Sequence, residues 1–275
     1  MFFLGKMATL EGVQALIADI DGVLTEGGKL SVVDSSLRKA IQDLRAKGIL
    51  FSLASGRPFF EQEEFHRLMI APDHYKEGEA ILYEASSVLL LGREEIYRLG
   101  GLTREQIKEI EAFASQQKLF VDMVRQANGD KYETTTGYVT STFVTEGRTN
   151  IKLLEKTYHR VKPILEKRFP FSEVCMSADA IDVYAKGINK AKPLQKYAEI
   201  TGISLDQMVV IGDSGNDMPM FELVGRAGGL AVYVGTNPEQ ERIVRGYTRH
   251  YISQQKGICG TIESLHYLLA MKNKQ

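Results

Sequence analysis

Three short apolar segments of this chain each end in a polar turn, and this feature limits the possible folds more than any other. The segments are QALIADI at 14–20, ILFSLAS at 49–55 and QMVVIG at 207–212. Apolar runs of this length suit strands that are buried on both faces of a sheet. Because helix-like patterns separate the segments, we expect a parallel sheet with helices on both faces.

The predicted helices carry clear start and stop signals. The segment 35–47 places its apolar residues on one helical face, follows Asp34 as a capping residue and stops at Gly48. A helix at 189–201 stops at Gly202 in the same way. Further strands are predicted at 80–84 and 230–234, and further helices at 237–245 and 261–271.

The middle of the chain has a different pattern. Between 85 and 185, short strand-like runs follow one another, and only two helices interrupt them, at about 103–117 and 149–168. Strands in succession predict a small α+β module with an antiparallel sheet. The chain is therefore predicted to have a Rossmann-like α/β core, formed by 1–84 and 186–275, with an α+β module inserted at 85–185.

Composition excludes several classes of protein. The 275 residues include 34 Lys and Arg and 35 Asp and Glu, so the net charge of −1 gives no bulk basic field for nucleic acid or an anionic membrane. The five histidines and two cysteines show no metal-binding spacing. No apolar run approaches the roughly 20 residues that span a bilayer, and the apolar run of three or four residues in the first segment, MFFLGKM, is shorter than the about 7–15 that a signal peptide needs. We expect a cytoplasmic protein of unknown oligomeric state.

Two of the polar turns follow the first two strands. Asp19 and Asp21 come at the carboxyl end of the first strand, where open α/β sheets bind ligands. Ser55 and Gly56 end the second strand and begin a helix, whose free N–H groups can bind an anion. Taken singly, each has a simpler interpretation: a solvated Asp-rich turn, or an ordinary serine cap.

The third turn, Gly212 to Asp217, adds two more carboxylates and an amide. Asn216 or Asp217 can also serve simply as a helix cap. If the three strand ends converge, Asp19, Asp21, Asp213 and Asp217 bring four negative charges together, and a cation or raised pKa values must relieve their repulsion. Carboxylates without His or Cys favour a hard cation, with Mg²⁺ first.

Four segments resemble the motifs of the haloacid dehalogenase (HAD) superfamily, whose phosphatases use an aspartate nucleophile. They are LIADIDGVLT, LASGRP, KGINKAKPL and IGDSGNDMPMF. Their order matches the more specific Cof-type branch, in which a large α+β cap lies between the second and third motifs. The interval between SGRP and KGINK leaves room for such a cap, so the resemblance covers nearly the whole layout of the chain.

The resemblance implies catalytic and phosphate-binding roles. Asp19 would be the nucleophile, and Asp21 would protonate the leaving oxygen and then activate water. Lys190 would neutralise the nucleophile and the phosphoryl group. The phosphate oxygens would be held by Ser55, Gly56 and Asn216.

The resemblance also implies a Mg²⁺ site. Asp213, Asp19 and the Asp21 carbonyl would be direct ligands. Asp217 would act through water or hold Lys190.

Two departures from the family pattern are visible. Ala191 follows Lys190 where a glycine is usual, and Lys186-Gly187 lies just upstream, so Lys186 is a competing assignment for the third motif. The position of Lys190 at the start of the 189–201 helix favours Lys190. The stretch Glu84-Ala85-Ser86-Ser87 replaces the Asn-Gly-Ala turn that is common after the third strand, which bears on entry to the cap.

The expected function is Mg²⁺-dependent hydrolysis of a small phosphate monoester, such as a sugar phosphate. The alternatives are a sugar phosphomutase, which would need a second phosphate site in the cap, and a non-catalytic ligand-binding homologue. Arg125, Lys131 and Arg148 lie in the predicted cap and are either surface charges or contacts for a distant anionic group.

Overall fold

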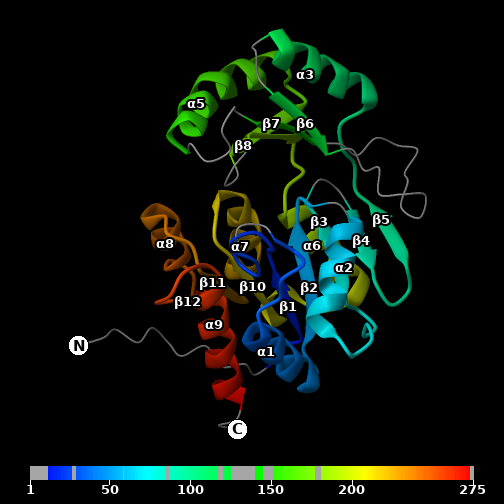
Figure 1. Cartoon of the computed structure of the whole chain (residues 1–275), viewed down its shortest axis with the longest axis vertical. Helices are drawn as coiled ribbons and strands as arrows, with labels where there is room; N and C mark the ends of the chain where they lie inside the picture. The colour runs from blue at the N-terminus through cyan, green and yellow to red at the C-terminus, as the bar shows by residue number, and fades with distance from the viewer. Residues whose placement is uncertain are drawn as a thin grey trace.

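The computed structural model describes residues 12–26, 29–57, 59–84, 87–116, 120–124, 140–144, 151–176 and 181–272. These residues form an eight-stranded sheet and a four-stranded sheet. Figure 1 shows the smaller sheet and its helices above the larger sheet.

The large sheet has the strand order β12-β11-β10-β1-β2-β3-β4-β5. The six strands from β12 to β3 are parallel, and β4 and β5 continue the sheet in antiparallel pairing. The bounds are β1 Ala15–Ala18, β2 Leu50–Ser55, β3 Ala80–Tyr83, β4 Ser87–Leu90, β5 Glu95–Arg98, β10 Met208–Gly212, β11 Leu230–Tyr233 and β12 His250–Ile252.

Two helical layers bury the two faces of this sheet, as the apolar strands predict. Leu16 and Ala18 of β1 belong to the apolar cluster under α1, α2 and α9, whereas Ala15 and Ile17 belong to the cluster under α6, α7 and α8. Successive side chains of a strand point to opposite faces, which explains this division. The helices are α1 Ser35–Ala46, α2 Phe59–Ile70, α6 Ala191–Thr201, α7 Met218–Arg226, α8 Pro238–Val244 and α9 Gly257–Lys272.

The predicted helix signals are confirmed at two ends. The Asp34 carboxylate accepts hydrogen bonds from the backbone N–H groups of Ser36 and Leu37, at 2.8 and 3.0 Å, and so caps α1. Gly202 ends α6 with a φ of 72°, a left-handed conformation that glycine adopts without steric penalty.

The four-stranded sheet has the order β6-β7-β9-β8 and is antiparallel throughout. Its strands are β6 Phe120–Val124, β7 Thr140–Val144, β8 Ser172–Met176 and β9 Ile181–Ala185, and its helices are α3 Arg104–Gln116 and α5 Ile151–Arg168. The helices share an apolar cluster with the sheet and lie on the side away from the large sheet (Figure 1). The predicted fold class, an α/β core with an added α+β unit, is confirmed.

The pairing of β4 and β5 differs from the predicted start of the inserted module at residue 85. β4 pairs with β3, and β5 pairs with β4, so residues 87–98 extend the large sheet. Backbone pairing across a hairpin, which a run of apolar residues does not reveal, assigns these strands to the core. We propose that the two sheets are the centres of two domains, and that the smaller domain extends from α3 to β9.

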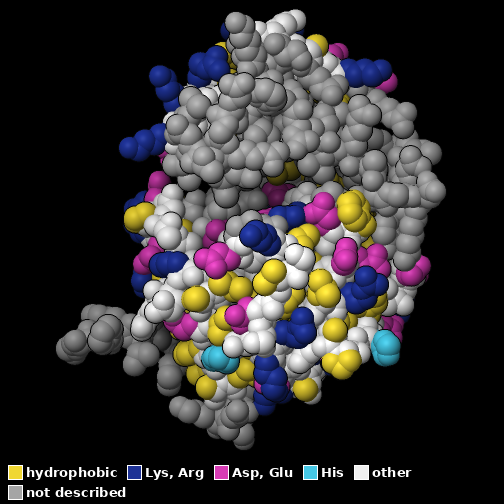
Figure 2. Space-filling view, viewed as in Figure 1, with side chains coloured by type: hydrophobic (Ala, Val, Ile, Leu, Met, Phe, Trp, Pro, Cys, Tyr) yellow, Lys and Arg dark blue, Asp and Glu magenta, His cyan; other side chains and the backbone are white. Residues whose placement is uncertain are grey.

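The described surface carries charges of both signs. Acidic and basic side chains are interspersed on the face of the core shown in Figure 2. No helix within the described ranges has the length and apolar character needed to cross a membrane. Arg125, Lys131 and Arg148 lie outside the described residues.

Candidate active site

Asp19 directly follows β1, an inner strand of the large sheet, at its carboxyl end. Its backbone N–H donates to the carbonyl of Ile211 at 3.0 Å, which ties it to β10, and it is only 4% exposed. Its Oδ1 accepts a hydrogen bond from the Ile20 N–H at 2.8 Å. Burial raises the pKa of Asp19; Lys190 opposes this effect, and Asp217 and Asp213 add to it.

Lys190 supplies the buried cation of the site. It is 0% exposed, and its Nζ lies 2.9 Å from Asp19 Oδ1 and 2.7 Å from Asp217 Oδ1. Burial lowers the pKa of Lys190, but Asp19 and Asp217 together outweigh burial and raise it. The ammonium is therefore retained at neutral pH. Lys186 is exposed, so the structure places Lys190, and not Lys186, beside Asp19.

The turn after β10 brings two more carboxylates to the same place. Asp217 Oδ2 accepts hydrogen bonds from the backbone N–H groups of Asp213 and Ser214, at 2.8 and 3.1 Å. A Cβ at Gly212 would lie 2.4 Å from Asp217 Cγ, so only glycine lets the turn close this tightly. Burial and the charge of Asp217 raise the pKa of Asp213 to about 7.

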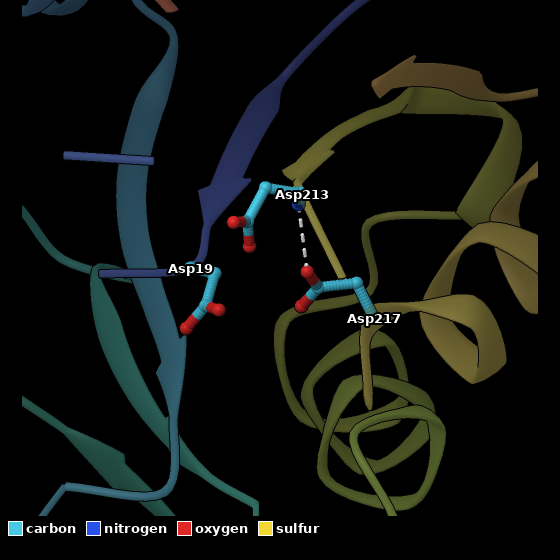
Figure 3. A group of neighbouring side chains, drawn as sticks. All are labelled: Asp19, Asp213 and Asp217. Carbon is cyan, nitrogen blue, oxygen red and sulfur yellow. Dashed lines mark hydrogen bonds between the residues drawn. The ribbon is translucent and has the colours of Figure 1, made fainter. Parts of the chain in front are cut away.

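Asp19, Asp213 and Asp217 form a cluster that fits a divalent cation (Figure 3). Each offers a carboxylate oxygen, and these oxygens lie within 4.8 Å of one another. The ammonium of Lys190 can balance only one of the three carboxylate charges. An all-oxygen donor set with excess negative charge suits Mg²⁺. Since both oxygens of Asp217 already hold Lys190 and the turn, Asp19 and Asp213 are the better ligands.

Asp21 lies at the outer side of the cluster, with 42% of its side chain exposed. Arg57 donates two hydrogen bonds to it, from Nε to Oδ2 at 2.7 Å and from Nη2 to Oδ1 at 2.8 Å. Arg57 also donates to Glu61 at 2.8 Å. Arg57 has no predicted role in the sequence motifs, although it lies in the same turn as Ser55 at a strand end.

The predicted phosphate-binding residues lie around Glu84. A Cβ at Gly56 would lie 3.3 Å from Glu84 Oε2, and the Asn216 amide donates to the same oxygen at 3.4 Å. Ser55 is buried at the end of β2, and its carbonyl accepts from the Glu84 N–H at 3.0 Å. The structure therefore brings together all of the predicted site residues. Glu84 was noted in sequence only as a departure from a turn pattern.

Comparisons with known proteins identify the family of this chain. The family model described as haloacid dehalogenase-like hydrolase matches residues 16–75 and 80–236. A curated relative, the phosphoglycolate phosphatase of Methanosarcina acetivorans, is 34% identical over 40% of this chain. That match covers 45% of the relative, so the chain spans about half the length of this curated protein.

Solved structures share the fold. A HAD/COF-like hydrolase from Plasmodium vivax superposes with a TM-score of 0.69 at 15% identity, covering 96% of each chain. The sucrose-phosphatase of Synechocystis sp. PCC6803 gives a TM-score of 0.61 at 18% identity, covering 92% of this chain and 97% of that one. The chain belongs to the haloacid dehalogenase-like hydrolase family. The resemblance to the haloacid dehalogenase superfamily that the four sequence motifs indicated is confirmed.

Proposed function

We propose that this protein is a Mg²⁺-dependent phosphatase that hydrolyses a small phosphate monoester through a phosphoryl group carried on Asp19. The observation that carries this proposal is the position of Asp19 at the end of β1, beside the buried Lys190 and the Asp213 carboxylate. A buried carboxylate held by a fixed ammonium is an oriented nucleophile whose repulsion from an anionic substrate is reduced.

The two oxygens of Asp19 take different roles. Among the described residues, Lys190 and the Ile20 N–H both contact Oδ1, so Oδ2 is placed to attack phosphorus. The new bond joins Oδ2 to phosphorus, and the bond from phosphorus to the ester oxygen breaks. Water then attacks phosphorus, the bond to Oδ2 breaks, and inorganic phosphate leaves with the carboxylate regenerated.

Asp21 is the group we assign to proton transfer. It gives its proton to the departing alcohol oxygen and takes one from the attacking water, so it returns to its starting state after each turnover. In this structure Arg57 donates one hydrogen bond to each oxygen of Asp21. Contact between an Asp21 oxygen and the departing alcohol or the water therefore requires that Arg57 release at least one of these hydrogen bonds.

The phosphate would be held by groups from the ends of β2 and β10 and from the start of α6. The Ser55 hydroxyl, the Gly56 N–H and the Asn216 amide are donors, and Lys190 adds a full positive charge. Asp19, Asp213 and the Asp21 carbonyl would hold Mg²⁺, with Asp217 fixing Lys190 behind them. When bound, Mg²⁺ would neutralise charge on the phosphoryl group and the carboxylates.

The substrate is proposed to be a sugar phosphate or a related small metabolite in the cytoplasm. The printed names of the relatives, a phosphoglycolate phosphatase and a sucrose-phosphatase, support a small organic phosphate. A phosphomutase would transfer the phosphoryl group back to substrate, and a binding homologue would not turn over at all. Neither nucleic acid nor a membrane is proposed as a partner.

The test is release of inorganic phosphate from a panel of phosphorylated metabolites, with Mg²⁺ and with chelator, for the wild type and Asp19→Asn. The amide keeps the volume of Asp19 but removes the nucleophile, so we expect turnover to fall by several orders of magnitude in a folded variant. Equal turnover of the two folded proteins would refute the assignment. Turnover of a sugar monophosphate that depends on an added sugar bisphosphate would identify a phosphomutase instead.

A further inference from the structure

Glu84 brings a carboxylate into the site from the end of β3. Its backbone N–H donates to the carbonyl of Ser55 at 3.0 Å, so the residue is fixed beside the end of β2. The residue is only 2% exposed. Burying a carboxylate is unfavourable unless neighbouring groups offset its desolvation, so the contacts of Glu84 must offset this cost.

The two oxygens of Glu84 contact different parts of the molecule. Oε2 accepts from Asn216 at 3.4 Å and lies 3.3 Å from a Cβ placed at Gly56. Oε1 accepts from the hydroxyl of Tyr184, on β9 of the small sheet, at 3.1 Å. The carboxylate therefore lies between the proposed phosphate-binding groups and the small sheet.

Glu84 also contributes to the electrostatic potential of the site. Burial lowers the pKa of Lys190, and Asp19, Asp217 and then Glu84 raise it. A substrate group that enters between Gly56 and Tyr184 therefore meets a negative charge. A hydroxyl there can donate a hydrogen bond to a charged acceptor, whereas a second carboxylate is repelled in a region that solvent screens poorly.

We propose that Glu84 determines specificity: it favours phosphate esters that carry a hydroxyl group next to the ester and disfavours those that carry a carboxylate there. This proposal rests on the proposed function, because it takes Gly56 and Asn216 as phosphate ligands. It separates the chemistry of a polyol or sugar phosphate from that of 2-phosphoglycolate, the compound named for the curated relative.

The test compares two esters that differ at one group, 2-hydroxyethyl phosphate and 2-phosphoglycolate. We expect the wild type to hydrolyse the hydroxyl compound with a kcat/KM at least about tenfold higher, the scale of an unfavourable close charge pair. Glu84→Gln keeps an acceptor oxygen for Tyr184 but removes the charge, so we expect the ratio to shift about tenfold toward 2-phosphoglycolate.

Two further variants separate charge from structure. Glu64→Gln removes an exposed carboxylate from α2 and should leave the ratio unchanged. Tyr184→Phe removes the hydrogen bond to Glu84 but keeps the charge, so discrimination against 2-phosphoglycolate should persist. A wild type that prefers 2-phosphoglycolate overturns the proposal without any variant. A folded Glu84→Gln protein with the wild-type ratio also overturns it, as does an equal shift in Glu64→Gln.

Binding measurements distinguish failure of this proposal from failure of the proposed function. Calorimetry of both esters with Asp19→Asn, alone and combined with Glu84→Gln, reports recognition without turnover. If the wild type releases no phosphate from any ester, the proposed function is wrong, and the ratio of the two dissociation constants still decides the role of Glu84. If Glu84→Gln leaves the ratio of dissociation constants unchanged, Glu84 does not determine specificity.

Discussion

Lys190 is the residue on which the charge balance of the site depends, because its ammonium contacts Asp19 and Asp217 where solvent does not reach. We expect Lys190→Ala to lower kcat by about 10²-fold or more, the scale of losing one oriented charge stabiliser. Lys186→Ala removes an exposed charge and should change kcat by less than about tenfold. The measurement is kcat at saturating Mg²⁺, and the reverse order would assign the third motif to Lys186.

Asp213 is the residue whose removal should report on the metal most directly. Asp213→Asn removes one charged oxygen from the cluster of three carboxylates. We expect the Mg²⁺ concentration for half-maximal binding to rise by about tenfold or more, as for other losses of metal-site residues. Calorimetric titration of Mg²⁺ into the metal-free proteins measures this, and an unchanged affinity would place the cation elsewhere.

The sequence predicts the residues of the site better than their contacts. Asp19 and Asp213 follow two of the strands, and Ser55 ends another. The apolar pattern predicts that these strands lie in one parallel sheet, whose carboxyl ends share an edge. The two hydrogen bonds from Arg57 to Asp21 depend on side-chain conformations in two separate turns. No spacing in the sequence encodes such a contact.

At the scale of elements, local signals determine helix ends but not strand partners. The Asp34 cap and Gly202 mark the limits of α1 and α6 because caps act on backbone groups a few residues away. β4 and β5, by contrast, read as part of the inserted module. Their place at the edge of the large sheet is determined by pairing with β3.

The cap of α1 gives a stability prediction at this scale. Asp34→Ala removes the acceptor for the N–H groups of Ser36 and Leu37, so we expect the free energy of unfolding to fall by about 1 kcal/mol. Asp43→Ala is the matched control, because Asp43 lies later in α1 in an exposed pair with Lys39. Its effect should stay within about 0.5 kcal/mol. Urea denaturation that shows equal effects would contradict a capping role.

At the scale of the whole molecule, the site is completed by contact between distant parts of the chain. The hydroxyl of Tyr184 donates to Glu84, which joins β9 of the small sheet to the end of β3. The order of motifs along the sequence predicts that a module is inserted, because the α/β pattern stops and then resumes. It does not predict which residue of the module reaches the core, since that depends on how two separately packed units meet.

The carboxylate cluster also makes the stability of the metal-free protein depend on pH. The pKa of Asp213 is raised by burial and by Asp217 to about 7, from an ordinary value of 3.8, and burial raises that of Asp19 as well. Between about pH 4 and pH 7 the folded protein therefore binds more protons than the unfolded chain, so the free energy of unfolding falls as pH rises. Burial lowers the pKa of His66, which acts in the opposite direction, so a variant is needed as reference.

Asp213→Asn supplies that reference, because it keeps His66 and Asp19 and removes one titrating group. We expect wild type to lose stability relative to Asp213→Asn as pH rises from 4 to 7, by up to about 4 kcal/mol, the upper limit that the pKa change of Asp213 allows. Added Mg²⁺ should reverse much of this loss in the wild type, because a bound cation favours the ionised carboxylates. Urea denaturation of both chelated proteins across this range makes the measurement. Parallel stability curves would show that Asp213 ionises in the folded protein as it does in the unfolded chain.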